Sequence, residues 1–252
     1  MNRRQFAYLG LAIGLLAAGA VTAQTVVPDY ITAALADPAR PQAHRDRDQA
    51  RKPGELVALA EVKPGDKVGD FIIGGGYFTR IFAGAVGPNG KVYAYQPKEF
   101  IDFSAQYGTD LDTVAAAYPN VTPLRNSLGA VSFPEPLDVI FTAQNYHDFH
   151  LGFMPAPAIA AVNKAMFDSL KPGGVLIIID HYAEDGSGTR DANTLHRIDV
   201  EVVKKEVTAA GFILESQSDI LRNPADDRKV SVFEEPAKGK TDQFVLKFRK
   251  PK

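Results

Sequence analysis

The 252-residue sequence contains no cysteine, no tryptophan and only three methionines. The lack of cysteine excludes disulfides, thiolate nucleophiles and cysteine-ligated zinc sites. An excess of either charge is also missing, because 28 lysine and arginine residues face 30 aspartate and glutamate residues, for a formal net charge of −2. This balance argues against a nucleic-acid partner, which a basic surface would attract. Hydrophobic residues make up 45% of the chain, enough for one sizeable core.

Residues 1–23 are typical of an export signal. Arg3 and Arg4 precede an apolar run over residues 6–20, and residues 21–23 (Val-Thr-Ala) are small, as a signal peptidase requires. The paired arginines also resemble a twin-arginine signal, so we expect a periplasmic or cell-envelope protein. An uncleaved membrane anchor is the weaker alternative, because the run is shorter than the ~20 apolar residues that span a bilayer. No stable membrane span is expected after cleavage.

Strand and helix patterns alternate along the rest of the chain. Apolar or alternating segments predict strands over residues 67–73, 91–95, 121–124, 137–143, 175–179, 212–216 and 244–248. Helical spacing predicts helices over residues 30–36, 55–61, 77–86, 109–118, 155–170 and 200–210. This alternation favours an α/β fold with a doubly wound, mostly parallel seven-stranded sheet. The last two strands follow each other without a helix between them, so the last strand is expected to be antiparallel.

A glycine-rich turn follows the first predicted strand. The stretch from Asp70 to Thr79 reads Asp-Phe-Ile-Ile-Gly-Gly-Gly-Tyr-Phe-Thr. Glycines let the backbone approach a ligand closely, and the helix that follows presents free N–H groups to it. In a parallel sheet, ligands bind at this end of the strands. A plain β–α turn is the alternative. The stretch is not the dinucleotide motif, because Thr79 stands at its last glycine position.

This stretch resembles the nucleotide-binding motif of class I S-adenosylmethionine-dependent methyltransferases. In that motif an acidic residue precedes three alternating glycines, and Tyr-Phe-Thr often follows. Asp70, Gly74, Gly76 and Tyr77 match it, whereas Ile72 stands where the first glycine is expected.

The resemblance continues to the end of the chain. Residues 170–174 and 210–212 are similar to the family's motifs before the fifth and sixth strands, so the resemblance covers roughly residues 55–250. The chain is most similar to a group of predicted exported methyltransferases, whose features include the stretches at residues 145–147, 180–181 and 195–199.

The resemblance implies S-adenosylmethionine as cofactor. The residues that it assigns to cofactor binding are Asp70, Gly74, Gly75, Gly76, Tyr77, Gln96 and Asn145. Gln96 stands where the family carries an acidic residue that accepts hydrogen bonds from the ribose hydroxyls. An amide offers one neutral acceptor in place of a carboxylate. Glu99 lies one turn further on and is a candidate to replace the missing carboxylate. We therefore expect weaker cofactor binding or a different ligand.

The resemblance also places a polar stretch after the fourth strand beside the methyl group and substrate. Asn145 is a candidate to fix a polar atom of the substrate, and Tyr146 is a candidate wall of the site. His147 is the first candidate for a catalytic base, because an unperturbed imidazole titrates near neutrality. His181 and His196 are the next candidates. The alternative is that these are ordinary loop histidines.

A metal site is the weaker interpretation of these histidines. His147 and His181, with Asp180 or His196, are a conceivable ligand set. No short-range pair among them has a distinctive ligand spacing, so we expect a polar, titratable substrate pocket without a metal.

The sequence therefore predicts an exported enzyme that transfers a methyl group from S-adenosylmethionine to a small molecule. The alternative is a catalytically degenerate ligand-binding or assembly protein on the same scaffold, and a histidine-based metal hydrolase is a third hypothesis. The predicted domains are a helical or lid segment at residues 24–54 and a methyltransferase-like domain at residues 55–252. Residues 28–53 and 218–241 are candidate lids, with solvated surface loops as the alternative. The oligomeric state cannot be read from the sequence.

Overall fold

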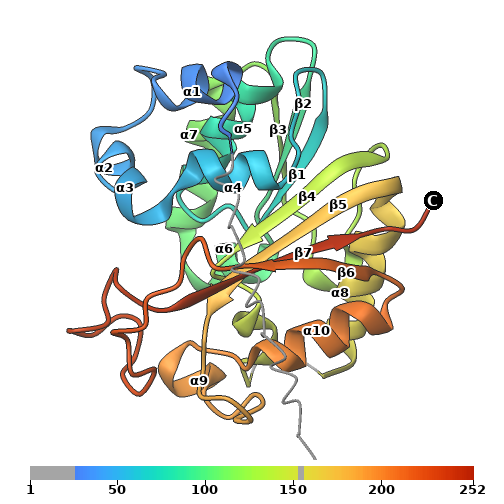
Figure 1. Ribbon diagram of the computed structural model, residues 1–252. Helices are drawn as coiled ribbons and strands as arrows, with labels where there is room; N and C mark the ends of the chain where they lie inside the picture. The colour runs from blue at the N-terminus through green and yellow to red at the C-terminus, as the bar shows by residue number, and fades with distance from the viewer. Residues whose placement is uncertain (1–25, 153–155) are drawn as a thin grey trace, which may run out of the picture.

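Seven strands form one sheet in the computed structural model, which describes residues 26–152 and 156–252 (Figure 1). The strands are β1 (Lys67–Phe71), β2 (Lys91–Tyr95), β3 (Val121–Leu124), β4 (Leu137–Ala143), β5 (Leu170–His181), β6 (Ile213–Ser218) and β7 (Gln243–Arg249). Their order is β3-β2-β1-β4-β5-β7-β6, with β7 antiparallel to both neighbours and the remaining pairs parallel. The predicted fold class and the antiparallel last strand are confirmed. The predicted signal peptide lies outside the described residues.

Alternate residues of the central strands pack into two separate hydrophobic cores, one on each face of the sheet. Along β5, Val175, Ile177 and Ile179 face one side of the sheet, and Leu176 and Ile178 face the other. The first side is covered by α1 (Asp29–Leu35), α4 (Pro53–Leu59), α5 (Tyr77–Val86) and α7 (Ala105–Ala117), and the second by α8 (Ala156–Ser169) and α10 (Val200–Ala209). Such continuous apolar strands are typical of a sheet covered on both faces, which is why the doubly wound prediction holds.

The remaining helices are short. They are α2 (Gln42–Arg45), α3 (Asp48–Arg51), α6 (Lys98–Phe103), α9 (Ala192–Leu195) and two 3-10 turns, η1 (Leu128–Ala130) and η2 (His147–His150). None of the helices in the described residues has the length and apolarity that a bilayer crossing requires.

Most element ends differ from the prediction by a few residues. Strand β1 ends at Phe71 rather than at residue 73, because Ile72 turns the chain with a φ of +65°. Helix α7 begins at Ala105, four residues earlier than predicted. Strand β5 begins at Leu170 rather than at residue 175, and its pairing with β4 shifts register near this end. The two cores are unaffected, because these changes fall at strand and helix ends.

Residues 26–54 fold onto the glycine turn. Helix α1 packs against α5 at Gly84, where an added Cβ would lie 2.8 Å from the Cβ of Ala34. The chain then runs through α2 and α3, which are fixed by a pair between buried Arg40 and Asp48 at 2.7 Å. The hydroxyl of Tyr77, at the start of α5, donates to the same carboxylate at 2.6 Å. These contacts hold α3 over the turn that follows β1.

The buried side chain of Arg197 anchors the long connection between β6 and β7. The guanidinium of Arg197 pairs with Asp226 at 2.8 Å and donates to the carbonyls of Tyr182 and Val230 at 3.1 and 3.0 Å. The backbone N–H of Val232 then donates to the carbonyl of Leu195 at 3.2 Å. The connection is therefore anchored against the segment that follows β5.

Candidate active site

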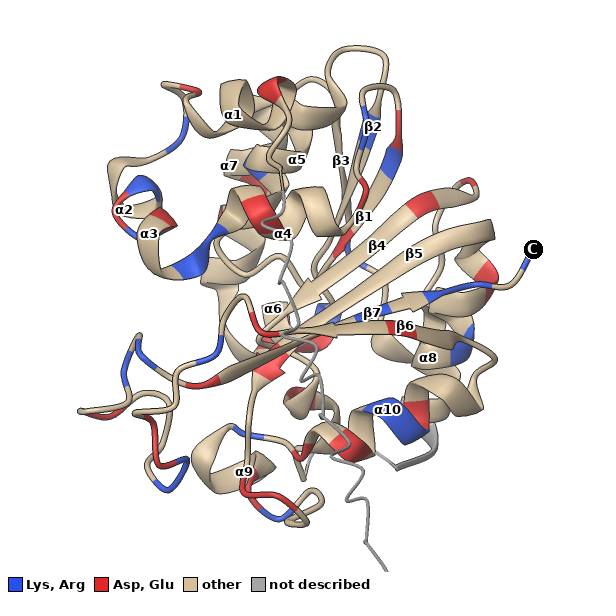
Figure 2. Ribbon diagram, viewed as in Figure 1, with Lys and Arg blue, Asp and Glu red and all other residues tan. Residues whose placement is uncertain are grey.

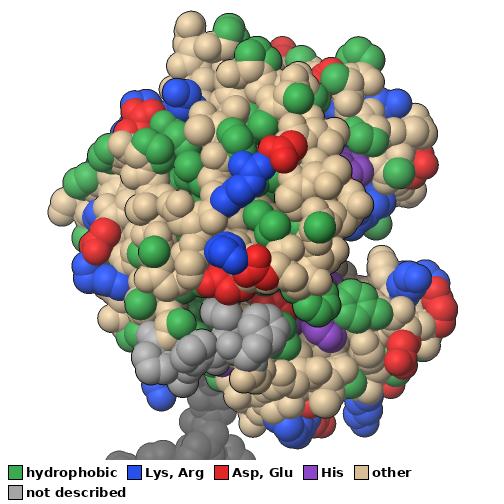
Figure 3. All heavy atoms as spheres, turned by 180° about the vertical axis from the view of Figure 1, so that it is seen from behind, with side chains coloured by type: hydrophobic (Ala, Val, Ile, Leu, Met, Phe, Trp, Pro, Cys, Tyr) green, Lys and Arg blue, Asp and Glu red, His purple; other side chains and the backbone are tan. Residues whose placement is uncertain are grey.

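Two adjoining cavities open at the carboxyl edge of the sheet. They share Ile72, Gly74, Gln144 and Asn145 as a common wall. The smaller cavity, ≈ 190 Å³, lies against α3, and the larger, ≈ 550 Å³, lies between α6 and the β6–β7 connection. The larger volume falls in the range of small-molecule sites, about 300–1,000 Å³. Figure 3 shows a notch in the surface with hydrophobic and histidine side chains along its lower edge.

The glycine turn forms the floor between the cavities. Gly74 has a left-handed φ of +52°, and an added Cβ there would meet nothing within 4 Å. An added Cβ on Gly75 would lie 3.9 Å from Nε2 of His44. Gly76 differs, because it lines neither cavity and its Cβ would lie 2.4 Å from Val114 of α7. Gly76 therefore lets α5 and α7 pack closely, and its predicted cofactor contact stays a prediction.

Gly76→Ala is expected to destabilise the fold by about 2–5 kcal/mol, from overpacking of about 1–3 and a left-handed backbone cost of about 1–2 kcal/mol. Gly75→Ala has room and no positive φ, so its effect should stay within about 0.5 kcal/mol. Urea unfolding of both variants measures the difference. Equal midpoints for the two variants would contradict the packing role of Gly76.

Ile72 occupies a strained position at the same turn. A β-branched residue with a φ of +65° is an outlier, at a cost of about 1–2 kcal/mol. Two hydrogen bonds hold it there: its N–H donates to Tyr95 O at 2.8 Å, and its carbonyl accepts from Nδ2 of Asn145 at 3.0 Å. Asn145 also donates to Ala143 O at 2.8 Å. The turn thus requires a left-handed backbone conformation at residue 72, which glycine adopts freely. The side chain of Ile72 lies in the wall between the two cavities.

Gln96 braces the glycine turn. Its Oε1 accepts from the N–H of Gly74 at 3.0 Å, so this acceptor faces the glycine turn, and Gln96 lines neither cavity. Its buried Nε2 has no hydrogen-bond partner among the described residues. Glu99 lines the larger cavity, and both of its carboxylate oxygens lie 3.1 Å from the N–H of Leu128. Glu99 is therefore the carboxylate that faces the cavity near the end of β2.

Asp70 and Tyr77 border the smaller cavity, as predicted. Asp70 is buried, and its Oδ2 accepts from the hydroxyl of Thr79 at 2.5 Å. Burial raises the pKa of the Asp70 carboxyl to about 7, although the bond from Thr79 and the charge of Arg51 oppose this shift. The Tyr77 ring lies under the guanidinium of Arg51, whose Cζ is 4.3 Å from the ring centroid.

A cationic wall faces Asp70 across the smaller cavity. Arg47 and Arg51 form it from the α2–α3 segment, and Figure 2 shows basic residues on α3. His44 lies beside them, but burial and the neighbouring arginines lower its pKa to about 4, so it carries no charge at neutral pH. The guanidinium of Arg51 makes no ion pair or hydrogen bond within residues 26–152 and 156–252. Burial and the neighbouring Arg47 lower the pKa of Arg51 to about 10, so it stays charged at neutral pH. A half-buried guanidinium without a carboxylate is suited to bind an anionic ligand group.

Three of the predicted histidines meet at the larger cavity. His147 Nδ1 lies 2.8 Å from Oδ1 of buried Asp180, and its Nε2 lies 3.3 Å from Nδ1 of His196. His181 binds the hydroxyl of Thr241 at 2.6 Å. All three histidines line the cavity.

The charges around the histidines differ strongly. Burial lowers the pKa of His147, but Asp180 and Asp148 outweigh burial and raise it to about 10. Burial, assisted by His147, lowers the pKa of His181 to about 3 and also lowers that of His196. The near-neutral pKa assumed for a base at His147 therefore does not hold, because its carboxylate neighbours favour a positive charge there.

Tyr146, the candidate wall of the site, lines neither cavity. Its fully buried hydroxyl donates to Glu206 at 3.0 Å and accepts from Asn163 at 2.7 Å. His150 also turns toward Glu206, at 3.2 Å. The η2 turn directs these side chains into the core beside α8 and α10, and directs only His147 and Asp148 into the cavity.

Comparisons with known proteins identify the fold. No protein-family model matches the chain, and no curated protein matches it. A SAM-dependent methyltransferase from Aquifex aeolicus is similar in structure, with a TM-score of 0.55 and 20% sequence identity. The match covers 88% of this chain and 97% of the Aquifex protein. Aeropyrum pernix fibrillarin with natively bound S-adenosyl-L-methionine has 18% identity, coverage of 82% and 75%, and a TM-score of 0.50. This chain has the class I methyltransferase fold.

The methyltransferase fold does not by itself fix the reaction. The [4+2]-cyclase SpnF is similar to this chain with a TM-score of 0.59 and 15% identity, covering 80% of this chain and 81% of that one. Function must therefore be argued from the site.

Within the methyltransferase fold, sequence reasoning missed the cationic wall and part of the larger cavity. Arg47 and Arg51 belong to a polar stretch that precedes the motif, and no local pattern connects them to it. Phe100, Tyr107 and Phe233 line the larger cavity from α6, α7 and the β6–β7 connection. The two candidate lids both border the cavities, which the length and polarity of these segments suggested.

Proposed function

We propose that this protein binds S-adenosylmethionine across the two cavities and transfers its methyl group to a small-molecule acceptor. The observation that carries the proposal is the Gly74–Gly75 backbone, which lies between a small cationic cavity and a larger aromatic one. A zwitterionic amino acid joined to a nucleoside has this same division of charge and apolar surface.

The smaller cavity fits the amino-acid end of the cofactor. Arg51 supplies a guanidinium for the carboxylate, and Asp70 supplies a carboxyl group for the ammonium. Gly75 keeps this floor free of side-chain atoms, so the backbone N–H groups at the start of α5 are approachable.

The larger cavity fits the nucleoside and the acceptor. Phe100 and Tyr107 offer aromatic surface to a base, and Glu99 offers a carboxylate to ribose hydroxyls. Phe103 and Phe233 are 82% and 64% exposed beside the same cavity. This apolar rim favours an acceptor with an apolar body.

The protein would contribute to the reaction mainly by aligning the reactants and excluding water. S-adenosylmethionine, when bound, supplies a methyl group activated by a positively charged sulfur. Asn145 and Ile72 hold the common wall, which would fix the reacting end of the ligand relative to the acceptor. Val232 and Phe233 close one side of the larger cavity and would exclude water. Alignment of this kind accelerates transfer by lowering the entropic cost of bringing the reactants together.

Calorimetry with S-adenosylmethionine, S-adenosylhomocysteine and adenosine tests the proposal. We expect saturable binding of all three compounds, weakest for adenosine, which lacks the amino-acid end. Protein that gives no heat with any of them contradicts the proposal.

A catalytically degenerate binding protein is the second candidate. The Gln96 acceptor that faces the glycine turn and the side chain of Ile72 between the cavities favour it. Mass spectrometry of small-molecule extracts incubated with the protein and S-adenosylmethionine separates the two: binding without any methylated product supports the second candidate.

We further propose that the protein is exported. The basic and apolar pattern of residues 1–23 supports this, and the absence of cysteine is compatible with an oxidising compartment. Fractionation of cells that express the full chain is expected to find a shortened product in the envelope fraction. Full-length protein confined to the cytoplasm would contradict export.

A further inference from the structure

We propose that His147, Asp148 and His196 form a binding site for one divalent transition-metal ion, Zn²⁺ or Fe²⁺, at the wall of the larger cavity. The site departs from the metal-free pocket that the sequence favoured. The metal site does not depend on the proposed methyl transfer, although its use in catalysis does.

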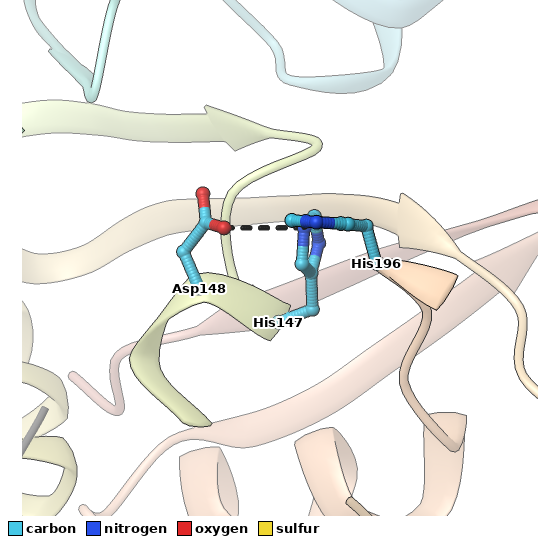
Figure 4. Close-up of side chains that lie close together, drawn as sticks. All are labelled: His147, Asp148 and His196. Atoms are coloured by element: carbon cyan, nitrogen blue, oxygen red, sulfur yellow. Dashed lines mark hydrogen bonds and ion pairs between the residues drawn. The ribbon is translucent and has the colours of Figure 1, made fainter. Parts of the chain in front are cut away.

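The ligand atoms already converge. Figure 4 shows the two imidazole rings and the Asp148 carboxylate close together. One nitrogen from each histidine and one oxygen of Asp148 all lie within 4.8 Å of one another. Nε2 of His147 is 3.3 Å from Nδ1 of His196 and 3.2 Å from Oδ1 of Asp148. Ligands about 2.0–2.2 Å from a tetrahedral ion lie about 3.3–3.6 Å apart, so these two separations are close to those around a bound ion. The third pair, Asp148 and His196, lies within 4.8 Å.

Asp180 holds His147 as a metal ligand is usually held. Its Oδ1 accepts from Nδ1 of His147 at 2.8 Å, and its Oδ2 accepts from the His147 backbone N–H at 2.7 Å. Asp180 is fully buried, so the ring orientation and the position of the Nδ1 proton are fixed. Nε2 is then directed at Asp148 and His196. A carboxylate behind a metal-bound histidine is the common outer-shell arrangement.

A proton satisfies this cluster less well than a metal ion. With Nδ1–H bound to Asp180, Nε2 of His147 carries either a lone pair or a second proton. The lone pair would face the Asp148 carboxylate at 3.2 Å, and a single proton would be shared between Asp148 and His196. One cation bound to all three atoms satisfies each of them.

His196 has an unusual backbone conformation, and the neighbouring residue Arg197 fixes this segment through a buried ion pair. His196 has a left-handed φ of +54°, which is uncommon outside glycine and is found at functional sites. The next residue, Arg197, is fully buried and paired with Asp226. The ring of His196 also packs on Phe233, with centroids 4.7 Å apart. The site is therefore preorganised from two separate segments of the chain.

The ligand set determines the class of ion. Two imidazoles and one carboxylate favour zinc or ferrous iron over magnesium and calcium, which prefer oxygen ligands. Three protein ligands at a cavity wall leave coordination positions open to a ligand in the cavity. If methyl transfer is the function, the ion would bind and polarise an oxygen of a hydroxyl-bearing acceptor.

The test is metal binding by the mature protein, without residues 1–23 and without an affinity tag, measured in the absence of S-adenosylmethionine. After chelator treatment and dialysis, the protein is titrated with Zn²⁺, Fe²⁺ under anaerobic conditions, and Mg²⁺, and the bound metal is counted by elemental analysis. We expect one Zn²⁺ or Fe²⁺ ion per chain and no retained Mg²⁺, and the relative affinities decide between zinc and iron. Co²⁺ is expected to give a visible absorption band from nitrogen and oxygen ligation.

Matched variants locate the site. His196→Ala and Asp148→Asn are expected to weaken binding at least tenfold, whereas His150→Ala, which removes a neighbouring histidine bound to Glu206, leaves it unchanged. Circular dichroism checks that each variant is folded. Protein that retains no transition metal, or loses it equally in His150→Ala, overturns the proposal. Calorimetry with S-adenosylhomocysteine on the metal-free protein shows whether the cofactor proposal stands on its own.

Discussion

Arg51→Met is expected to weaken the binding of S-adenosylhomocysteine by about 30- to 4,000-fold. Truncating one partner of a desolvated charge pair costs about 2–5 kcal/mol, and each 1.4 kcal/mol is about tenfold in affinity. Arg51 borders the smaller cavity and has no carboxylate partner among the described residues, so it is available to a ligand carboxylate. Methionine keeps an unbranched apolar side chain on the Tyr77 ring, so the packing of α3 is preserved.

Two controls make the Arg51 result specific. Arg190→Met removes an exposed guanidinium that pairs with Glu184 and Asp191 and borders neither cavity, so it should not change binding. Adenosine has no carboxylate, so its affinity should be the same for Arg51→Met and the unaltered chain. Equal loss of adenosine and S-adenosylhomocysteine binding would mean that the substitution disturbs the whole site rather than a carboxylate contact.

Arg197→Met is expected to destabilise the protein by about 3–5 kcal/mol, the usual cost of breaking a buried ion pair. The side chains of Arg197 and Asp226 are 0% and 3% exposed, so the substitution leaves a buried carboxylate without its cation. It also removes the donors to the carbonyls of Tyr182 and Val230. The β6–β7 connection would lose its anchor, and Phe233 would move away from His196.

Urea unfolding measures the effect of Arg197→Met. The control is Arg125→Met, which breaks a surface pair with Asp112 and should cost under about 1 kcal/mol. A loss for Arg197→Met no larger than that of the control would show that the buried pair is not what holds the connection.

The fold was predictable because its signals are local. The apolar strand at residues 175–179 alternates between two cores, and alternation with helices along the chain predicts a sheet covered on both faces. The antiparallel last strand followed from the missing helix between the last two strands. The short helices α2, α3 and α6 were missed, because four to six residues carry too little periodicity to detect.

The site was predictable only in part. The glycine turn was located from its place after a strand, but the roles within it depend on neighbours distant in sequence. Val114 of α7 explains Gly76, and the direction of the η2 turn sends Tyr146 into the core and His147 into the cavity. The cationic wall comes from a segment that precedes the motif and reaches it only through tertiary packing.

A crystal structure of the mature protein with S-adenosylhomocysteine tests the central claim most directly. The account predicts the carboxylate of the ligand at Arg51, its sulfur beside Gly74 and Asn145, and its ribose hydroxyls at Glu99 in the larger cavity. A structure grown at saturating ligand in which both cavities hold only solvent, or in which the Ile72 side chain bars passage between them, would contradict it.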